Sequence, residues 1–290
     1  MQQSDVDSSR KRLDRPIFYF RFFAGIGPLL CAATLWPGEV FAGNADIFKA
    51  DNALSLDFGA SYLNYAETQS GMTLDTEKGW LPTAHIGVGM MASERSPIAN
   101  LYLHIDSQMS LGTTAYNGAL CDQFGNCTPY QSDTYNHFFD SAIQLGRGFP
   151  LGNEVIVTPF AEIGYRYWAR HAGGIGAYAE DYWNWDGLGG LLAQYSPADR
   201  WVLSLEGGAG KTFGADMETS GKKFKLGSEL IWRTKAEVGY RLTDHLELTS
   251  TAAYESIGFA ASAVDTNGYY EPDSTTHQTT LMLGVAYHFF

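Results

Sequence analysis

The sequence predicts an all-β protein, specifically a ten-stranded antiparallel transmembrane β-barrel. After Asn52, apolar and polar residues alternate with the two-residue period of a β-strand, and segments of this kind recur ten times. The segments run for about 11–17 residues, which is longer than the strands of about 5–6 residues usual in soluble sheets. The connections between them alternate between short and long, which is typical of membrane barrels.

The composition excludes several other classes of protein. The chain has 17 Tyr, 17 Phe and 7 Trp, which is too aromatic for a disordered chain. A formal net charge of −13 argues against nucleic-acid binding, which needs clustered Lys and Arg. The mean hydropathy of −0.18 argues against a helical membrane protein, as does the lack of an apolar run of about 18 residues. A membrane β-barrel remains possible, because the alternation of apolar and polar residues in its strands lowers their mean hydropathy.

Residues 1–42 have the features of a secretory signal peptide. An apolar stretch at 26–36 precedes small or branched residues that allow cleavage after Ala42, with Ala45 as a second candidate. The alternative is an uncleaved inner-membrane anchor, and Leu30 before Cys31 argues against a lipoprotein signal. A basic region, Arg10, Lys11, Arg12 and Arg15, precedes the apolar stretch. We therefore expect residues 43–290 to form the barrel with long extracellular loops.

The first five strands are expected at about 54–62, 80–90, 101–111, 135–149 and 155–170. In each, an apolar face lies opposite a face rich in polar or small residues. The fifth shows this most clearly, since Val155, Val157 and Ile163 alternate with Glu162 and Arg166.

The last five strands are expected at about 182–195, 201–212, 226–242, 246–255 and 281–289. The first of these has the weakest pattern, because Leu188, Leu191 and Leu192 break its alternation. If that segment is not a strand, the alternative is a barrel of eight strands, which keeps the even number of such barrels.

The distribution of charge favours a membrane barrel over a soluble β-sandwich. Charged residues share a strand face with Gly and Ser, whereas the opposite face carries Tyr and Trp near the segment ends. In a sandwich the charged face would be outside, while in a barrel the aromatic residues form girdles at the two membrane interfaces. The charged face is therefore predicted to line the lumen.

The connections predict which end of the barrel holds the termini. Short turns are expected at 93–99, 150–153, 196–200 and 243–245, and long loops at 67–79, 115–134, 171–181, 214–225 and 259–277. Short turns face the periplasm in such barrels and long loops face the outside. Both termini are therefore expected on the periplasmic side.

The last residues of the chain carry a further pattern, which consists of Leu281, Leu283, Val285, Tyr287 and Phe289. It resembles the C-terminal signature of Gram-negative outer-membrane β-barrel proteins. The resemblance implies a location in the cell outer membrane, contact with its lipid and lipopolysaccharide, and recognition of Tyr287 and Phe289 by the barrel-assembly machinery. One residue, Phe290, follows the in-phase Phe289.

The predicted lumen face carries charges of both signs. The acids are Asp57, Asp106, Asp140, Glu162, Glu206, Glu229, Glu237, Glu247 and Glu255, and the bases are Arg166, Arg170, Arg233, Lys235 and Arg241. A ten-stranded barrel is narrow, so these residues are interpreted as a network of salt bridges that fills the lumen. The alternative is a pore lining, in which the excess of acids would weakly favour cations.

The spacing of charges on the fifth strand predicts where their partners lie. Glu162, Arg166 and Arg170 share one face, but neighbours four residues apart along a strand are about 13 Å apart. They cannot pair with one another, so their partners must come from other strands. We therefore predict that Arg166 and Arg233 each contact a carboxylate of a different strand.

An enzyme is also considered, because the length and strand number resemble those of the omptin proteases. That resemblance would imply an Asp pair and an Asp–His pair at the extracellular rim, where the only candidates are Asp273, His277 and His171. His104 and Asp106 lie mid-strand, out of reach of a protein substrate. The leading hypothesis is therefore a non-enzymatic barrel, either a narrow pore or a structural and surface-interaction protein, without cofactor or metal.

The expected loops suggest a ligand and a disulfide. Three aromatic residues, Tyr182, Trp183 and Trp185, lie among carboxylates after the fifth strand. Because aromatic faces beside carboxylates suit sugar rings, a glycan or exopolysaccharide is a candidate partner of this loop. Cys121 and Cys127 lie in one polar stretch, a spacing that in an exported protein predicts a local disulfide.

Overall fold

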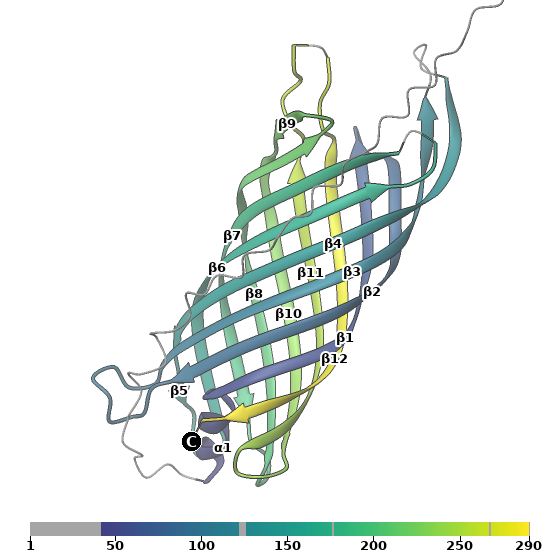
Figure 1. The fold of residues 1–290 in the computed structure, drawn as a ribbon. Coiled ribbons are helices and arrows are strands. Elements are labelled where there is room, and N and C mark those ends of the chain that lie inside the picture. The colour runs from purple at the N-terminus through teal and green to yellow at the C-terminus, as the bar shows by residue number, and fades with distance from the viewer. Residues whose placement is uncertain (1–41, 122–125, 176, 267, 290) are drawn as a thin grey trace, which may run out of the picture. The chain divides into compact units, whose positions relative to one another are not determined.

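The computed structural model describes residues 42–121, 126–175, 177–266 and 268–289. Ten long strands form one sheet in which all neighbours are antiparallel, and the pairing of β12 with β1 and of β8 with β10 closes it into a barrel (Figure 1). The long strands are β1 (Ala53–Gln69), β2 (Met72–Met91), β3 (Leu101–Cys121), β4 (Cys127–Arg147), β6 (Val155–Ala172), β7 (Tyr178–Tyr195), β8 (Trp201–Thr219), β10 (Gly227–Arg241), β11 (Leu246–Ala260) and β12 (Asp273–His288). The ten-stranded prediction is confirmed, and the alternative of eight strands is wrong.

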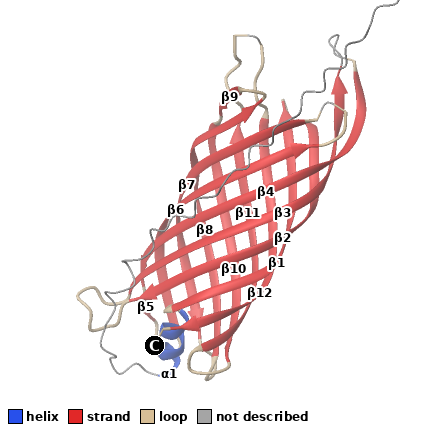
Figure 2. Ribbon diagram, viewed as in Figure 1, coloured by secondary structure: helices blue, strands red, loops and turns tan. Residues whose placement is uncertain are grey.

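Three short elements complete the described structure. Helix α1 (Ala42–Ala50) lies beside the C-terminal end of the chain, while β5 (Phe149–Pro150) pairs with β6 and β9 (Lys222–Lys225) pairs with β8 (Figure 2). We call the end of the barrel that holds α1 the proximal end and the opposite end the distal end. The four connections predicted to be short all lie at the proximal end. No helix among the described residues is long and apolar enough to cross a membrane.

Most of the segments expected to be long distal loops are strands instead. β1 and β2 are joined by Ser70 and Gly71, with φ of 51° and 79°, and β8 and β9 by Ser220 and Gly221, with φ of 49° and 75°. Positive φ at both central residues is typical of a tight type I′ hairpin turn. Among the described residues, the connection between β11 and β12 remains long, at 261–272, whereas residues 122–125 of another expected loop lie outside the described residues. The expectation was wrong because polar residues occur in strands that face water as well as in loops. The distal parts of these strands extend beyond the membrane into water.

Two belts of outward-facing aromatic residues mark the membrane-spanning part of the barrel. The distal belt contains Tyr62 against Trp80, Tyr165 against Trp185, and Trp232 against Tyr254, with ring centroids 5.2, 5.0 and 4.9 Å apart. The proximal belt contains Trp201 against Tyr240, 4.7 Å apart, together with Tyr195 and Tyr287. Trp232 and Tyr240 lie eight positions apart on β10. With the usual rise and tilt, this separates the belts by about 20 Å, close to the apolar band of a membrane barrel.

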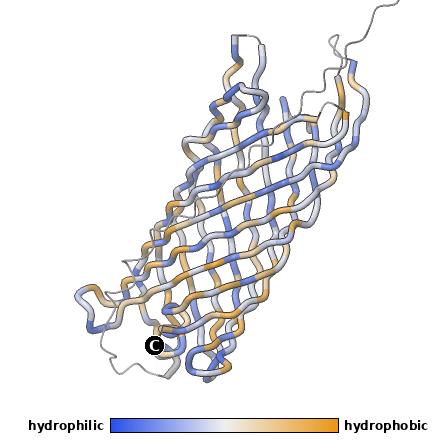
Figure 3. The backbone as a smooth tube through the Cα atoms, viewed as in Figure 1, coloured by the Kyte–Doolittle hydropathy of each residue, from blue (hydrophilic) through white to orange (hydrophobic). Residues whose placement is uncertain are grey.

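In strands such as β1, the apolar face changes sides at the distal belt. Between the belts, β1 directs Leu54 and Phe58 outward and the buried Asp57 into the lumen. Beyond the distal belt, it directs Leu63 and Tyr65 inward, both of them fully buried. The resulting alternation of hydropathy along the strands is visible in Figure 3.

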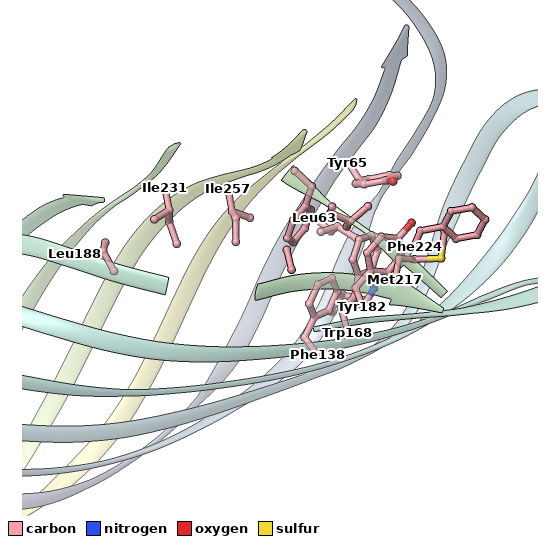
Figure 4. Close-up of a cluster of buried hydrophobic side chains, with 14 residues drawn as sticks. Leu63, Tyr65, Phe138, Trp168, Tyr182, Leu188, Met217, Phe224, Ile231 and Ile257 are labelled. Atoms are coloured by element: carbon pink, nitrogen blue, oxygen red, sulfur yellow. The ribbon is translucent and has the colours of Figure 1, made fainter. Parts of the chain in front are cut away.

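The distal half therefore has an apolar core inside the barrel (Figure 4). Trp168 lies between Phe138 and Tyr182, with ring centroids 4.8 and 5.0 Å away, and Tyr65 meets it edge-on at 5.0 Å. The members of this distal core are Leu63, Tyr65, Leu81, Phe138, Trp168, Tyr182, Leu188, Ala215, Met217, Phe224, Leu226, Ile231, Ile257 and Phe259. Leu188 on β7 faces inward to join it, which is one reason why the alternation of that strand looked irregular.

A second apolar cluster lies at the proximal end, under helix α1. Ile47 of the helix is fully buried against Tyr102, Phe160 and Leu192, while Leu191 faces outward. The helix is fixed by Asp46, which forms an ion pair with Arg241 of β10. We call this the proximal cap. The lumen between the proximal cap and the distal core is polar.

Candidate functional site: the lumen between the distal core and the proximal cap

The lumen contains the network of salt bridges that the sequence predicts. Arg166 of β6 is 7% exposed and forms ion pairs with Asp140 of β4 and Glu255 of β11. Arg233 of β10 lies 2.7 Å from Glu162 of β6 and 3.3 Å from Glu255. Both arginines thus contact carboxylates of other strands, so the prediction for them is confirmed. Glu255, shared between them, joins the two sets of pairs.

Other predicted lumen charges form smaller contacts. Lys235 lies 3.3 Å from Glu206, and the second oxygen of Asp57 lies 2.9 Å from His85 Nδ1 on the neighbouring strand. The first oxygen of Asp57 accepts a hydrogen bond of 2.6 Å from Thr249. The first contact joins the neighbouring strands β8 and β10, and the Asp57 contacts join β1 to its neighbour β2 and to β11.

Three predicted members of the network are not paired as expected. Asp106 lies in the lumen but forms no ion pair with any described residue, and Glu237 accepts only a 3.3 Å hydrogen bond from Thr251. Glu229 is exposed, because the pairing of β10 with β11 is irregular between Ser228 and Ile231. Its assignment to the lumen network was wrong.

Arg170 forms a separate cluster beyond the distal belt. Its guanidinium is fully buried and lies 2.8 Å from Glu77, 2.7 Å from Glu180 and 3.5 Å from Glu67. It also lies over the ring of Tyr65 at 5.0 Å. Sequence analysis missed these three partners because it placed them in distal loops. Strict alternation continued past Tyr62 and Trp80 would have found Glu67 and Glu77.

The connection at 261–272 closes against the same cluster. Glu271 accepts a 2.7 Å hydrogen bond from the Tyr182 hydroxyl, and its backbone N–H donates to Ser262 Oγ at 2.8 Å. Burial, together with the nearby charges of Glu180 and Glu67, raises the pKa of Glu271 to about 9. The carboxyl group is therefore protonated at neutral pH, which suits its position beside other acids.

A polar cavity of about 200 Å³ occupies the lumen between the arginine network and the proximal cap. Its wall includes His85, His104 and Asp106, while Asp51 forms part of its proximal side. Asp51 lies between α1 and β1, and burial raises its pKa to about 7. Among the described residues, no group of three or more His, Cys, Asp or Glu side chains is placed to hold a metal ion.

The aromatic residues considered for glycan binding do not share one surface. They belong to β7 rather than to a loop, so successive side chains point to opposite sides of the wall. Tyr182 is buried in the distal core, whereas Trp183 and Trp185 face outward, the latter in the distal belt. The expectation of a single loop cluster was therefore wrong.

The rim candidates for a protease also face away from the lumen. His171 is exposed and stacks on Tyr135, while His277 packs against Tyr254 on the outer face, with its Nδ1 2.9 Å from the hydroxyl. Asp273 accepts a hydrogen bond of 2.8 Å from the backbone of Ala261. No Asp–His pair forms from these residues, so they do not reproduce the arrangement expected of an omptin-like site.

Three further predictions involve residues at the edges of the described structure. The backbones of Cys121 and Cys127 lie opposite each other where β3 meets β4, and the disulfide stays a prediction. Tyr287 is exposed in the proximal belt, and the Phe289 backbone N–H donates to Asn52 O at 3.0 Å. The predicted signal segment up to residue 41 and the terminal Phe290 lie outside the described residues.

Comparison with known proteins supports the fold. The outer membrane protease OmpT from Escherichia coli has a similar structure, with a TM-score of 0.56 and 9% identity, over 82% of this chain and 97% of that one. An outer membrane channel from Pseudomonas putida F1 matches with a TM-score of 0.38 and 10% identity over 87% and 99% of the two chains. Neisserial surface protein A matches with a TM-score of 0.31 and 12% identity over 81% and 97%.

No family model and no curated protein matches the sequence. At 9% identity, the similarity to OmpT shows the fold and nothing about the reaction. The chain therefore has the fold of outer-membrane β-barrel proteins, as its C-terminal pattern indicated.

Proposed function

We propose that this protein is a non-enzymatic barrel of the Gram-negative outer membrane that acts as a structural and surface-interaction protein rather than as a channel. The proximal end then faces the periplasm, and the distal belt lies at the lipopolysaccharide leaflet. The observation that carries the proposal is the distal core, a cluster of packed, buried aromatic and aliphatic side chains inside the barrel. An open pore needs a continuous polar path, and a dry core of this kind interrupts it.

Several contacts support a rigid closure rather than a movable gate. Trp168 and Arg170 of β6 are both buried, and the Trp168 indole N–H donates to Asn136 Oδ1 at 2.7 Å. Most of the closing side chains come from the strands of the wall itself. Opening the lumen would therefore require the barrel to unfold locally. At the proximal end, α1 adds a second closure.

Planar-bilayer recording tests the absence of a channel. We expect no stepwise conductance from the wild-type protein, whereas a barrel with a water-filled lumen would give steady ohmic steps. A double variant, Phe138→Ser with Trp168→Ser, is the matched control because it removes two stacked rings of the distal core. Conductance in the wild type would refute the closed-lumen proposal.

Membrane location is tested separately. Extraction with the outer-membrane fraction and heat-modifiable migration on gels are expected for a folded membrane barrel. Recovery of the protein as a soluble periplasmic monomer would contradict this part of the proposal.

A further inference from the structure

The polar cavity has more acidic than basic groups, and its bases are already paired. Three cationic side chains line it, namely Arg166, Arg233 and Lys235, and each forms an ion pair with carboxylates of the network. Seven carboxylates line it, namely Asp51, Asp106, Asp140, Glu206, Glu237, Glu247 and Glu255. Of these, Asp51, Asp106 and Glu237 form no ion pair among the described residues, although Lys235 interacts electrostatically with Glu237. The cavity therefore holds more carboxylates than cations.

A second observation points to a missing hydrogen-bond donor. Gln144 and Gln194 each leave the side-chain oxygen without a partner, although each residue is only 3% exposed. The amide nitrogen of Gln144 donates to Glu162 and Glu206, and that of Gln194 donates to Asp51. One oxygen of Asp51 is also buried and without a donor. All three oxygens belong to residues that line the cavity, and buried acceptors normally have partners.

Part of the remaining wall is apolar, beside hydroxyl, amide and imidazole side chains. Ala50, Ala53, Leu192, Met282 and Ala286 line the same cavity as the acceptors. A hydrated inorganic ion gains little from such a surface, whereas an alkyl chain removes it from water. The described His, Cys, Asp and Glu side chains also form no metal-binding group. The cavity volume of about 200 Å³ leaves room for several non-hydrogen atoms in addition to water.

We propose that this cavity binds a small alkylammonium cation, such as a primary amine or a diamine. An ammonium group donates three hydrogen bonds and carries the positive charge that Asp106 and Glu237 lack. Its alkyl chain packs against Leu192 and Met282. The proposal goes beyond the closed-lumen function and does not depend on it, because conductance reports the distal core and amine binding reports the cavity.

Binding is tested with 1,4-diaminobutane and the full chain, folded in detergent micelles. The diamine is added either before refolding or after it, since the proximal cap and the distal core restrict access. We expect the thermal midpoint to rise by about 5 °C at a concentration of about 100 times Kd. The control compound is 1,4-butanediol, which has the same chain length but no charge. Sodium chloride at equal ionic strength controls for electrostatic screening.

Variants locate the site. The double variant Asp106→Asn with Glu237→Gln is expected to weaken diamine binding at least tenfold by calorimetry, whereas Asp244→Asn, in an exposed proximal turn, leaves it unchanged. If the double variant does not fold, the wild-type comparison of diamine with diol decides the question. The proposal is overturned if the diamine gives no shift in either order of addition, if the diol or salt gives an equal shift, or if the folded double variant binds like the wild type.

Discussion

Replacement of Arg170 by methionine tests the dry distal interior most directly. The arginine is fully buried, and its removal leaves Glu77 and Glu180, which lie within 2.8 Å of it, without their cation. Glu77 is fully buried as well, so water cannot replace the lost partner. Removing one member of such a buried pair costs about 3–5 kcal/mol. A pair in a wet lumen would cost less than about 1 kcal/mol.

The assay is urea unfolding in lipid vesicles, followed by tryptophan fluorescence and by gel migration. Lys223→Met is the matched control, because Lys223 lies 3.1 Å from Asp216 but its side chain is 50% exposed. We expect a loss of less than about 1 kcal/mol for this control. The double variant Arg170→Met with Glu77→Gln should recover part of the lost stability by removing one stranded charge. A loss for Arg170→Met no greater than the control's would refute the dry interior.

Three further predictions test other parts of the barrel. Arg166→Ala should lower the unfolding free energy by about 3 kcal/mol without creating conductance, whereas unchanged stability with altered ion selectivity would favour a channel. The pKa of Glu271 is raised to about 9 in the folded state, so the folded protein keeps a proton that the unfolded chain loses near the usual pKa of a glutamate. The free energy of unfolding should therefore fall as the pH rises from about 5 to 9. Glu271→Gln should flatten this dependence in unfolding measured at several pH values, and an unchanged slope would contradict the assignment. A Cβ added at Gly210 would lie 1.9 Å from Gly187 O, so Gly210→Ala should cost about 2 kcal/mol in urea unfolding, whereas Gly189→Ala, with no atom within 4 Å, should be tolerated.

The strands could be predicted from sequence because their period of two is a local property. Leu54 and Asp57 needed no tertiary information to be assigned to opposite faces, and both assignments are confirmed. The pairing partners of Arg166 and Arg233 could be limited to other strands by distance alone. Their identities depend on which strands face each other across the lumen, which alternation does not contain.

The distal half was less predictable, for a physical reason. The sequence was interpreted under one rule, with apolar residues outside and polar residues inside, and that rule fails beyond the distal belt. Leu188 lies three residues from Trp185 toward the proximal end, so the rule also fails there, where an apolar residue faces inward between the belts. Glu67 and Glu77 were placed in a loop, although they flank a buried arginine. Helix α1 begins at Ala42, the last residue of the predicted signal peptide, and no structure was predicted from the sequence for the residues directly after it.

The change of sides at the distal belt means that strands such as β1 and β2 obey two sets of substitution rules. Between the belts, an outward residue such as Phe58 meets lipid, so a charge there would be costly. Beyond the distal belt, an outward residue such as Lys78 of β2 meets water, and the intolerance moves to its inward neighbour Glu77 and to Leu81. Along β2, the positions that tolerate substitution should therefore alternate with a period of two residues, and this alternation should shift by one residue near Trp80. The position of that shift would locate the edge of the bilayer without any lipid being observed.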